Sequence, residues 1–292
     1  MQIAFHIGAN CTDDDQLIKS IRKNAAALEM EGIHVPPIGR YRRIIRETVQ
    51  NLDSPQPHID VREKLLDAII DNPHHTERLV LSNSAFLCVS NRIFEGASFY
   101  QLADEKIEAI SRIFANDELE LYLAIRNPAS FVPAAYMESK KATFGAYMHG
   151  MNPNDIRWSE LITRIQALAP NATLTVWANE DTPLIWAELM RELSGVDPLT
   201  RITGGFDLLA TIMSKAGMQR FTSYLKSHPP QSEAQKRRVI SAFLDKFALE
   251  EEIDQEISIP EWTEALVDKL TETYEDDLVT IQQMPNVRFI AP

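Results

Sequence analysis

Apolar residues along the chain fall into two kinds of pattern, short continuous runs and longer segments with helical spacing. The continuous runs predict buried parallel strands over residues 2–7, 118–125 and 173–177. The runs RLVLS and AFLCV are consistent with one interrupted strand over 78–82 and 85–89. Shorter runs predict two further strands, at 33–35 and at 287–290, where the chain would return to the sheet.

Helical spacing of apolar residues dominates the segments between these runs. It predicts helices over 12–31, 42–49, 61–70, 102–114, 128–147, 155–168 and 183–193. Residues 51–58 (NLDSPQPH) have the composition of a loop. Strands that alternate with helices favour a parallel sheet with helices on both faces. We therefore predict a three-layer α/β fold.

The pattern changes at Gly204, after which helices follow one another without an intervening strand. They are expected over 206–213, 218–225, 233–247 and 261–278. We therefore predict an α/β domain over 1–203 and a helical C-terminal extension over 204–292 that packs on it.

Composition narrows the classes of partner and compartment. There are 29 Lys and Arg against 42 Asp and Glu, which gives a net charge of -13. This charge disfavours binding to nucleic acid and to anionic membranes. The two cysteines, Cys11 and Cys88, form no CxxC pair, so a structural zinc site is not expected. No apolar run approaches the ~18 residues of a membrane span, and the first run is too short for a signal peptide. We expect a reduced, cytoplasmic protein.

Two segments resemble motifs of the P-loop sulfotransferases. Residues 6–21 (HIGANCTDDDQLIKSI) look like that family's phosphosulfate-binding loop between the first strand and first helix. Residues 121–136 (LYLAIRNPASFVPAAY) look like its strand that ends in Arg-Asp/Asn-Pro. The resemblance covers about residues 1–195 and implies a fold of the P-loop NTPase/sulfotransferase type. It also implies that 3'-phosphoadenosine-5'-phosphosulfate would contact Gly8, Ala9, Asn10, Cys11, Thr12, Arg126 and Ser130, with Arg126 on the 3'-phosphate.

The first loop departs from this motif at the positions that carry its chemistry. Cys11 stands where the family has a lysine, and Asp13 stands where it has a glycine. Asp14 and Asp15 replace hydroxyl residues, and Ala134 replaces a serine of the second motif. At ~5 Å and an effective dielectric constant of ~20, each carboxylate would repel a bound negative charge by about 3 kcal/mol. We therefore expect a non-catalytic binding or interaction module with a small-molecule or protein partner; the alternative is an active sulfotransferase with a hydroxyl or amine acceptor.

A short basic segment, GRYRRIIRET, stands out in this acidic chain. Within it we predict Arg40 and Arg43 as substrate-binding residues. Two other interpretations stay open at this point, that the arginines pair with Asp13–Asp15 or that they form a solvated helix face. Adjacent aspartates at a helix start rarely converge on one cation, so no metal site is predicted.

Three further side chains have a chemical and a structural interpretation. His6 is either part of the ligand loop or a hydrogen-bonded core histidine. Cys11 is either a reactive thiol or a small buried residue. Glu47 lies, with His34, in the region where the resembled family often places the base that activates its acceptor.

Overall fold

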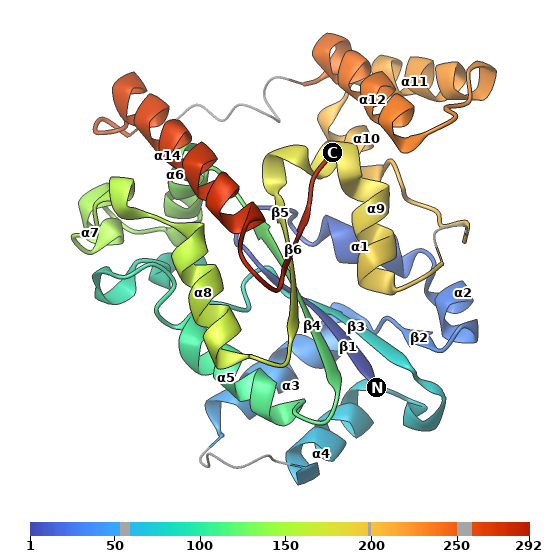
Figure 1. Cartoon of the computed structure of the whole chain (residues 1–292), viewed down its shortest axis with the longest axis vertical. Coiled ribbons are helices and arrows are strands. Elements are labelled where there is room, and N and C mark those ends of the chain that lie inside the picture. Colours follow the sequence, from blue (N-terminus) through green and yellow to red (C-terminus); the bar gives the residue numbers. More distant parts are fainter. Residues whose placement is uncertain (53–58, 198–199, 250–258) are drawn as a thin grey trace.

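The computed structural model describes residues 1–52, 59–197, 200–249 and 259–292. Its centre is a sheet of six parallel strands in the order β2-β3-β1-β4-β5-β6 (Figure 1). The bounds of the strands are β1 Gln2–Gly8, β2 Ile33–His34, β3 Arg78–Ser82, β4 Glu118–Ile125, β5 Thr173–Ala178 and β6 Val287–Ile290. The structure thus confirms the α/β class and the expected return of the chain to the sheet at 287–290.

Helices cover both faces of this sheet, because side chains of successive strand residues point to opposite faces and are apolar on both. On one face, Ala4 of β1 packs with α1 (Gln16–Arg22), α2 (Ala25–Met30) and α9 (Thr182–Ser194). On the other, Ile3, Phe5 and Ile7 join the larger core, which is formed with α3 Ile38–Gln50, α4 Ile59–Ile69, α5 Ala103–Ile113, α6 Pro128–Ser139, α7 Phe144–Met148, α8 Trp158–Leu168 and α14 Glu264–Gln282. The fold is therefore a three-layer α/β sandwich.

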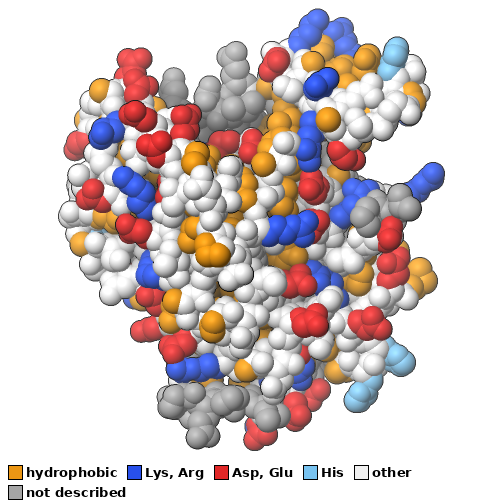
Figure 2. Space-filling model, in the orientation of Figure 1, with side chains coloured by type: hydrophobic (Ala, Val, Ile, Leu, Met, Phe, Trp, Pro, Cys, Tyr) orange, Lys and Arg blue, Asp and Glu red, His pale blue; other side chains and the backbone are white. Residues whose placement is uncertain are grey.

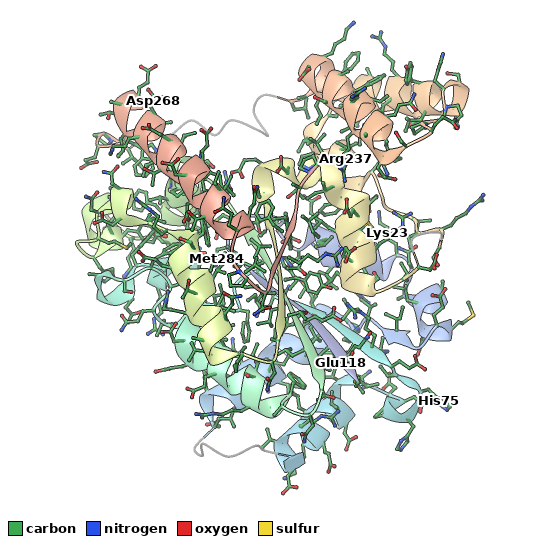
Figure 3. The ribbon with its side chains drawn as sticks, viewed as in Figure 1. Lys23, His75, Glu118, Arg237, Asp268 and Met284 are labelled. Atoms are coloured by element: carbon green, nitrogen blue, oxygen red, sulfur yellow. The ribbon has the colours of Figure 1, made fainter. Side chains whose placement is uncertain are left out.

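Three helices form a separate arm. They are α10 (Asp207–Ile212), α11 (Lys215–Ser227) and α12 (Glu233–Phe247), and they share a small core of Leu209, Met213, Phe221 and Ile240. The arm is held to the body by an ion pair of 2.6 Å between Arg237 and Glu188 of α9, and Arg237 is labelled at this junction in Figure 3. By contrast, α14 packs against α6 and α8 in the larger core.

Several predicted elements have different bounds in the structure. The helix expected over 12–31 is two helices, because Asn24 turns its side-chain amide back onto the carbonyls of Ser20 and Ile21. The helix expected over 128–147 ends at Ser139, where Lys140 takes a left-handed conformation with φ 56°.

Residues 85–89, which were expected to continue a strand, form no strand. The Asn83 side chain accepts a hydrogen bond from the Ala85 amide at 3.2 Å, and the Asn83 carbonyl accepts one from Phe86. These bonds turn the chain away from the sheet directly after β3.

The strand order creates a switch point at the carboxyl ends of β1 and β4. The chain leaves β1 toward β2 on one side of the sheet, whereas it leaves β4 toward β5 on the other. Ligands of open α/β sheets bind in the crevice at such a point. The first loop and Arg126 both lie there.

Candidate functional site

The first loop, residues 8–15, and the Arg-Asn-Pro segment come together at this switch point. The Arg126 guanidinium donates from Nη1 to the carbonyl of Cys11 at 2.7 Å and from Nε to Ser130 Oγ at 3.0 Å. Its backbone carbonyl accepts a hydrogen bond from the Trp158 indole at 2.9 Å. The seven residues that the resemblance predicts to contact the phosphosulfate nucleotide therefore lie in one region. They are Gly8, Ala9, Asn10, Cys11, Thr12, Arg126 and Ser130.

Part of the backbone of this loop is hydrogen-bonded within the protein. The Ala9 amide donates to the Ala124 carbonyl at 2.9 Å, and the Asn10 amide donates to the Tyr100 hydroxyl at 3.3 Å. The Thr12 hydroxyl donates to the Ala9 carbonyl at 2.8 Å. Two of the amides that were expected to face phosphate therefore already have partners.

The aspartates lie in the loop rather than in the first helical turn, because α1 begins at Gln16 and not near Thr12. The Thr12 hydroxyl points back to Ala9 instead of capping a helix. Asp14 and Asp15 have left-handed backbones, with φ of 46° and 66°. Asp13 is buried, and its Oδ2 accepts the Leu17 amide at 3.0 Å. The expected start of this helix at residue 12 is thus wrong, and Asp13 accepts a hydrogen bond from the first turn of α1.

Asp15 is neutralised by an arginine of α3. Arg42 donates from both terminal nitrogens to the two oxygens of Asp15, at 2.5 and 2.9 Å, and from Nε to the Ser82 carbonyl at 2.9 Å. Burial acts to raise the pKa of Asp15, but the hydrogen bonds and charge of Arg42 outweigh it and hold that pKa below its ordinary value. Bidentate pairs of this kind are among the stronger charge-assisted contacts. Arg42 is therefore committed to the protein's own carboxylate.

The remaining charge in the loop is negative. Burial, followed by the nearby carboxylates of Glu138 and Asp13, raises the pKa of Asp14. Burial and Glu138 likewise raise the pKa of the Cys11 thiol well above its ordinary value. Cys11 is therefore a protonated thiol at neutral pH, which argues against a thiolate nucleophile at this position.

His6 belongs to the core beneath the loop. Its Nδ1 lies 3.0 Å from Ser82 Oγ, and its ring lies 5.6 Å from that of Trp177. Burial lowers the pKa of His6, and the charge of Asp13 opposes this only in part, so the ring is neutral at pH 7. Neither His6 Nε2 nor Asp13 Oδ1 has a hydrogen-bond partner among the described residues.

Several residues that hold the site had no signal in the sequence pattern. Tyr100 donates to the Asn10 side chain at 2.7 Å, and Ser90 donates to Glu138 at 2.6 Å. Asn127 caps α6, and its amide group donates to Thr271 of α14 at 3.0 Å. These residues come from elements that are distant in the sequence, so no spacing rule could have assembled them.

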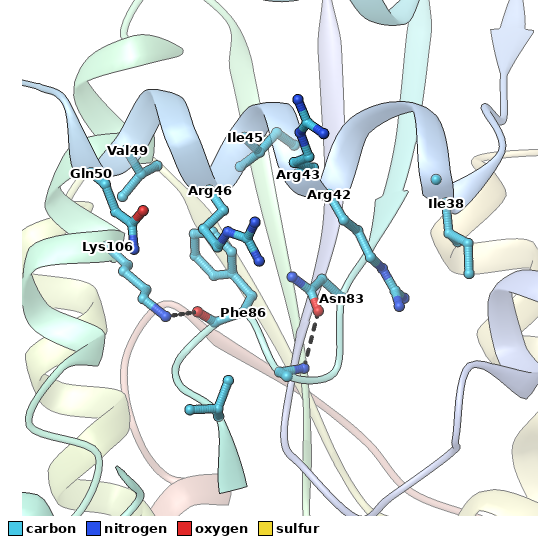
Figure 4. Close-up of a pocket in the computed structure, with 13 residues that line it drawn as sticks. Ile38, Arg42, Arg43, Ile45, Arg46, Val49, Gln50, Asn83, Phe86 and Lys106 are labelled. Atoms are coloured by element: carbon cyan, nitrogen blue, oxygen red, sulfur yellow. Dashed lines mark hydrogen bonds between the residues drawn. The ribbon is translucent and has the colours of Figure 1, made fainter. Parts of the chain in front are cut away.

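The basic segment of α3 divides its charges among different partners. Arg40 forms a bidentate pair with Asp71 at 2.6 and 2.7 Å, at the end of α4 and away from the loop. Arg43 pairs with Glu47 at 3.0 Å on an exposed helix face. Arg46 forms no ion pair within the described part of the chain. Arg43 and Arg46, but not Arg40, line a cavity of about 410 Å³ (Figure 4).

Comparison with protein-family models, with curated proteins and with solved structures finds no match for this chain. Within the described ranges there is no group of three or more His, Cys, Asp or Glu side chains placed to hold a metal ion. The assignment of a function therefore rests on the geometry above.

Proposed function

We propose that this chain is a sulfotransferase-like protein whose first loop has lost the binding of phosphoadenosine phosphosulfate and which acts as a non-catalytic binding or interaction module. The proposal treats the fold as a divergent member of the P-loop type. It is supported by the central position of β1 in a parallel sheet and by the contact between Arg126 and the loop that follows β1.

The observation that carries the proposal is the bidentate pair between Arg42 and Asp15. A phosphosulfate loop needs cations and free amides that face the ligand. In this chain the nearest α3 cation is neutralised by a loop carboxylate, and the amides of Ala9 and Asn10 are bonded internally. Asp13 and Asp14 add two further carboxylates, and each would repel a bound anion by about 3 kcal/mol at ~5 Å.

An active sulfotransferase is the second candidate, and one observation favours it. Arg126 uses Nε and Nη1 within the protein and forms no ion pair with any described residue, so its remaining N–H groups are available to a phosphate. In that case phosphoadenosine phosphosulfate would be the donor, and Arg126 would bind its 3'-phosphate. Sulfation of any acceptor that is abolished by Arg126→Ala would establish this candidate.

A gain of binding tests the main proposal. The double variant Cys11→Lys with Asp13→Gly restores the residue types of the resembled loop. We expect it to bind 3'-phosphoadenosine-5'-phosphate measurably by calorimetry, whereas the matched variant Cys11→Met with Asp13→Gly, which lacks the new charge, should not. Equal binding by both double variants would show that the lysine position has been assigned incorrectly. Thermal unfolding of each variant checks that the loop tolerates the loss of the Asp13 contact to Leu17.

A further inference from the structure

A cleft runs between α3, α5 and the loop that follows β3. Its first part is the cavity of about 410 Å³, and its second is a cavity of about 550 Å³. The two parts share lining residues, so they form one continuous cleft; the shared residues are Arg46, Val49, Gln50, Val89 and Lys106. We refer to it as the α3–α5 cleft.

The first part of the cleft is lined by cations and by no carboxylate. Four basic residues line it, namely Arg42, Arg43, Arg46 and Lys106. Arg42 forms an ion pair with Asp15, and Arg43 forms one with Glu47. The other two cations are Arg46 and Lys106. Within the described residues neither Arg46 nor Lys106 has a carboxylate partner, and the Lys106 ammonium donates only to the Phe86 carbonyl at 2.7 Å. In a chain of net charge -13, two neighbouring cations without counterions are a notable local excess.

The second part of the cleft differs in its charge balance. Its two additional arginines are paired with nearby glutamates, Arg92 with Glu95 and Arg112 with Glu108. Its lining also includes one carboxylate, Glu105, that forms no ion pair with any described residue. The free positive charge is therefore concentrated where the two parts meet, at Arg46 and Lys106.

Apolar side chains form the wall between these two cations. In Figure 4, Arg46 and Lys106 both reach toward Phe86, whereas Arg43 points away from it. Val49 lies beside Phe86 in the same lining. Val89 is 52% exposed, so its side chain offers apolar surface to a ligand. An apolar surface beside uncompensated cations suits a ligand that has both an apolar body and an anionic group.

We propose that the α3–α5 cleft binds a small amphipathic organic anion, with its anionic group between Arg46 and Lys106 and its apolar body against Phe86, Val49 and Val89. The inference goes beyond the loss of nucleotide binding at the first loop and does not depend on it, because neither Arg46 nor Lys106 belongs to that loop or hydrogen-bonds to it among the described residues. Burial lowers the pKa of Lys106, and a bound anion would oppose that effect by stabilising the charged ammonium.

Calorimetric titration of the full chain tests this proposal. The probes are octanoate and octyl phosphate, which differ in the anionic group, and octanol, which keeps only the apolar body. We expect saturable binding of one equivalent of at least one anion, and at least about tenfold weaker binding of octanol, because a charge-assisted hydrogen bond is lost. Preference for octanoate or octyl phosphate then identifies the anionic group as a carboxylate or a phosphate.

Variants locate the binding. Arg46→Gln and Lys106→Met should each weaken the binding of the anion by at least about tenfold. Arg238→Gln, which removes an exposed arginine of α12 with no ion pair among the described residues, should leave binding unchanged. Val89→Asp, at an exposed position of the wall, should weaken the binding of the anions more than it weakens the binding of octanol. The proposal is overturned if neither anion saturates at millimolar concentration, if octanol binds as well as the anions, or if Arg46→Gln and Lys106→Met leave binding intact.

Discussion

Asp15 illustrates how one residue changes the chemistry of a loop. In the resembled motif a hydroxyl would stand in this region and leave the neighbouring cations free for the ligand. Here the Asp15 carboxylate binds Arg42 through two hydrogen bonds and ties the loop to α3. The same contact that neutralises the cation also ties the loop to α3, so under the proposed function a loss of nucleotide binding and a more ordered loop would have one physical cause.

At the same scale, the reactivity of Cys11 can be predicted. Burial and the carboxylate of Glu138 keep the thiol protonated, so we expect iodoacetamide to label it far more slowly than an accessible free cysteine near neutral pH. Glu138→Gln should raise the rate a few-fold, because it removes only the second cause. Mass spectrometry separates Cys11 from Cys88, whose pKa burial raises to about 12. Rapid labelling of native Cys11 would contradict this account of the loop.

The burial of His6 leads us to predict that the stability of the protein depends on pH. Burial lowers its pKa in the folded protein, so the unfolded chain takes up a proton first as the pH falls below the ordinary histidine value of ~6.5. The free energy of unfolding should therefore decrease from about pH 7 to about pH 5.5. His6→Asn should reduce this decrease, whereas His74→Asn, at an exposed position of a short 3-10 helix, should retain it. Urea unfolding at both pH values gives the comparison, and an unchanged pH dependence in His6→Asn would refute the assignment.

At the scale of elements, the arm of α10–α12 is only weakly built compared with the α/β body. Its core has four buried residues, while many of its other apolar residues are only partly covered. Phe221 is fully buried and packs edge-on against Phe206 and Phe243, with ring centroids 5.1 and 5.4 Å away. Phe221 is therefore a central residue of a small core.

Truncation of Phe221 should unfold the arm without unfolding the body. Removal of a buried phenylalanine costs about 3–5 kcal/mol, a large loss for so small a core. In Phe221→Ala we expect hydrogen exchange to rise across 207–247 and to stay low in β1 and β4. Tyr224→Ala, at a position that is 40% exposed, should change exchange little. A loss of protection throughout the sheet would mean that the arm and the body unfold as one unit.

The elements also indicate how far prediction from sequence reaches. The runs QIAFHI, ELELYLAI and TLTVW correspond to β1, β4 and β5, because continuous apolar runs have few other stable solutions in a parallel sheet. The proximity of Arg126 to the first loop was implied by the resemblance to the sulfotransferase motifs. The partners of the loop could not be predicted in this way, because Arg42, Tyr100 and Glu138 reach it from three separate segments of the chain. Lys106 in the cleft was missed for the same reason.

At the scale of the whole molecule, charge is interspersed over the surface. On the face shown in Figure 2, acidic and basic side chains alternate, and several basic groups lie on the arm at the upper right. Within the ranges described, no helix has the length and apolar character to cross a bilayer. The negative charge is thus locally uneven: carboxylates are concentrated in the first loop and are absent from the lining of the first part of the α3–α5 cleft.

Titration of the unmodified protein with 3'-phosphoadenosine-5'-phosphate tests the central claim most directly. Because Arg42 is paired with Asp15 and two loop amides are bonded internally, we predict no saturable heat of binding up to millimolar nucleotide. Saturable binding at micromolar concentration that is lost in Arg126→Ala would contradict the account and place the nucleotide at the first loop.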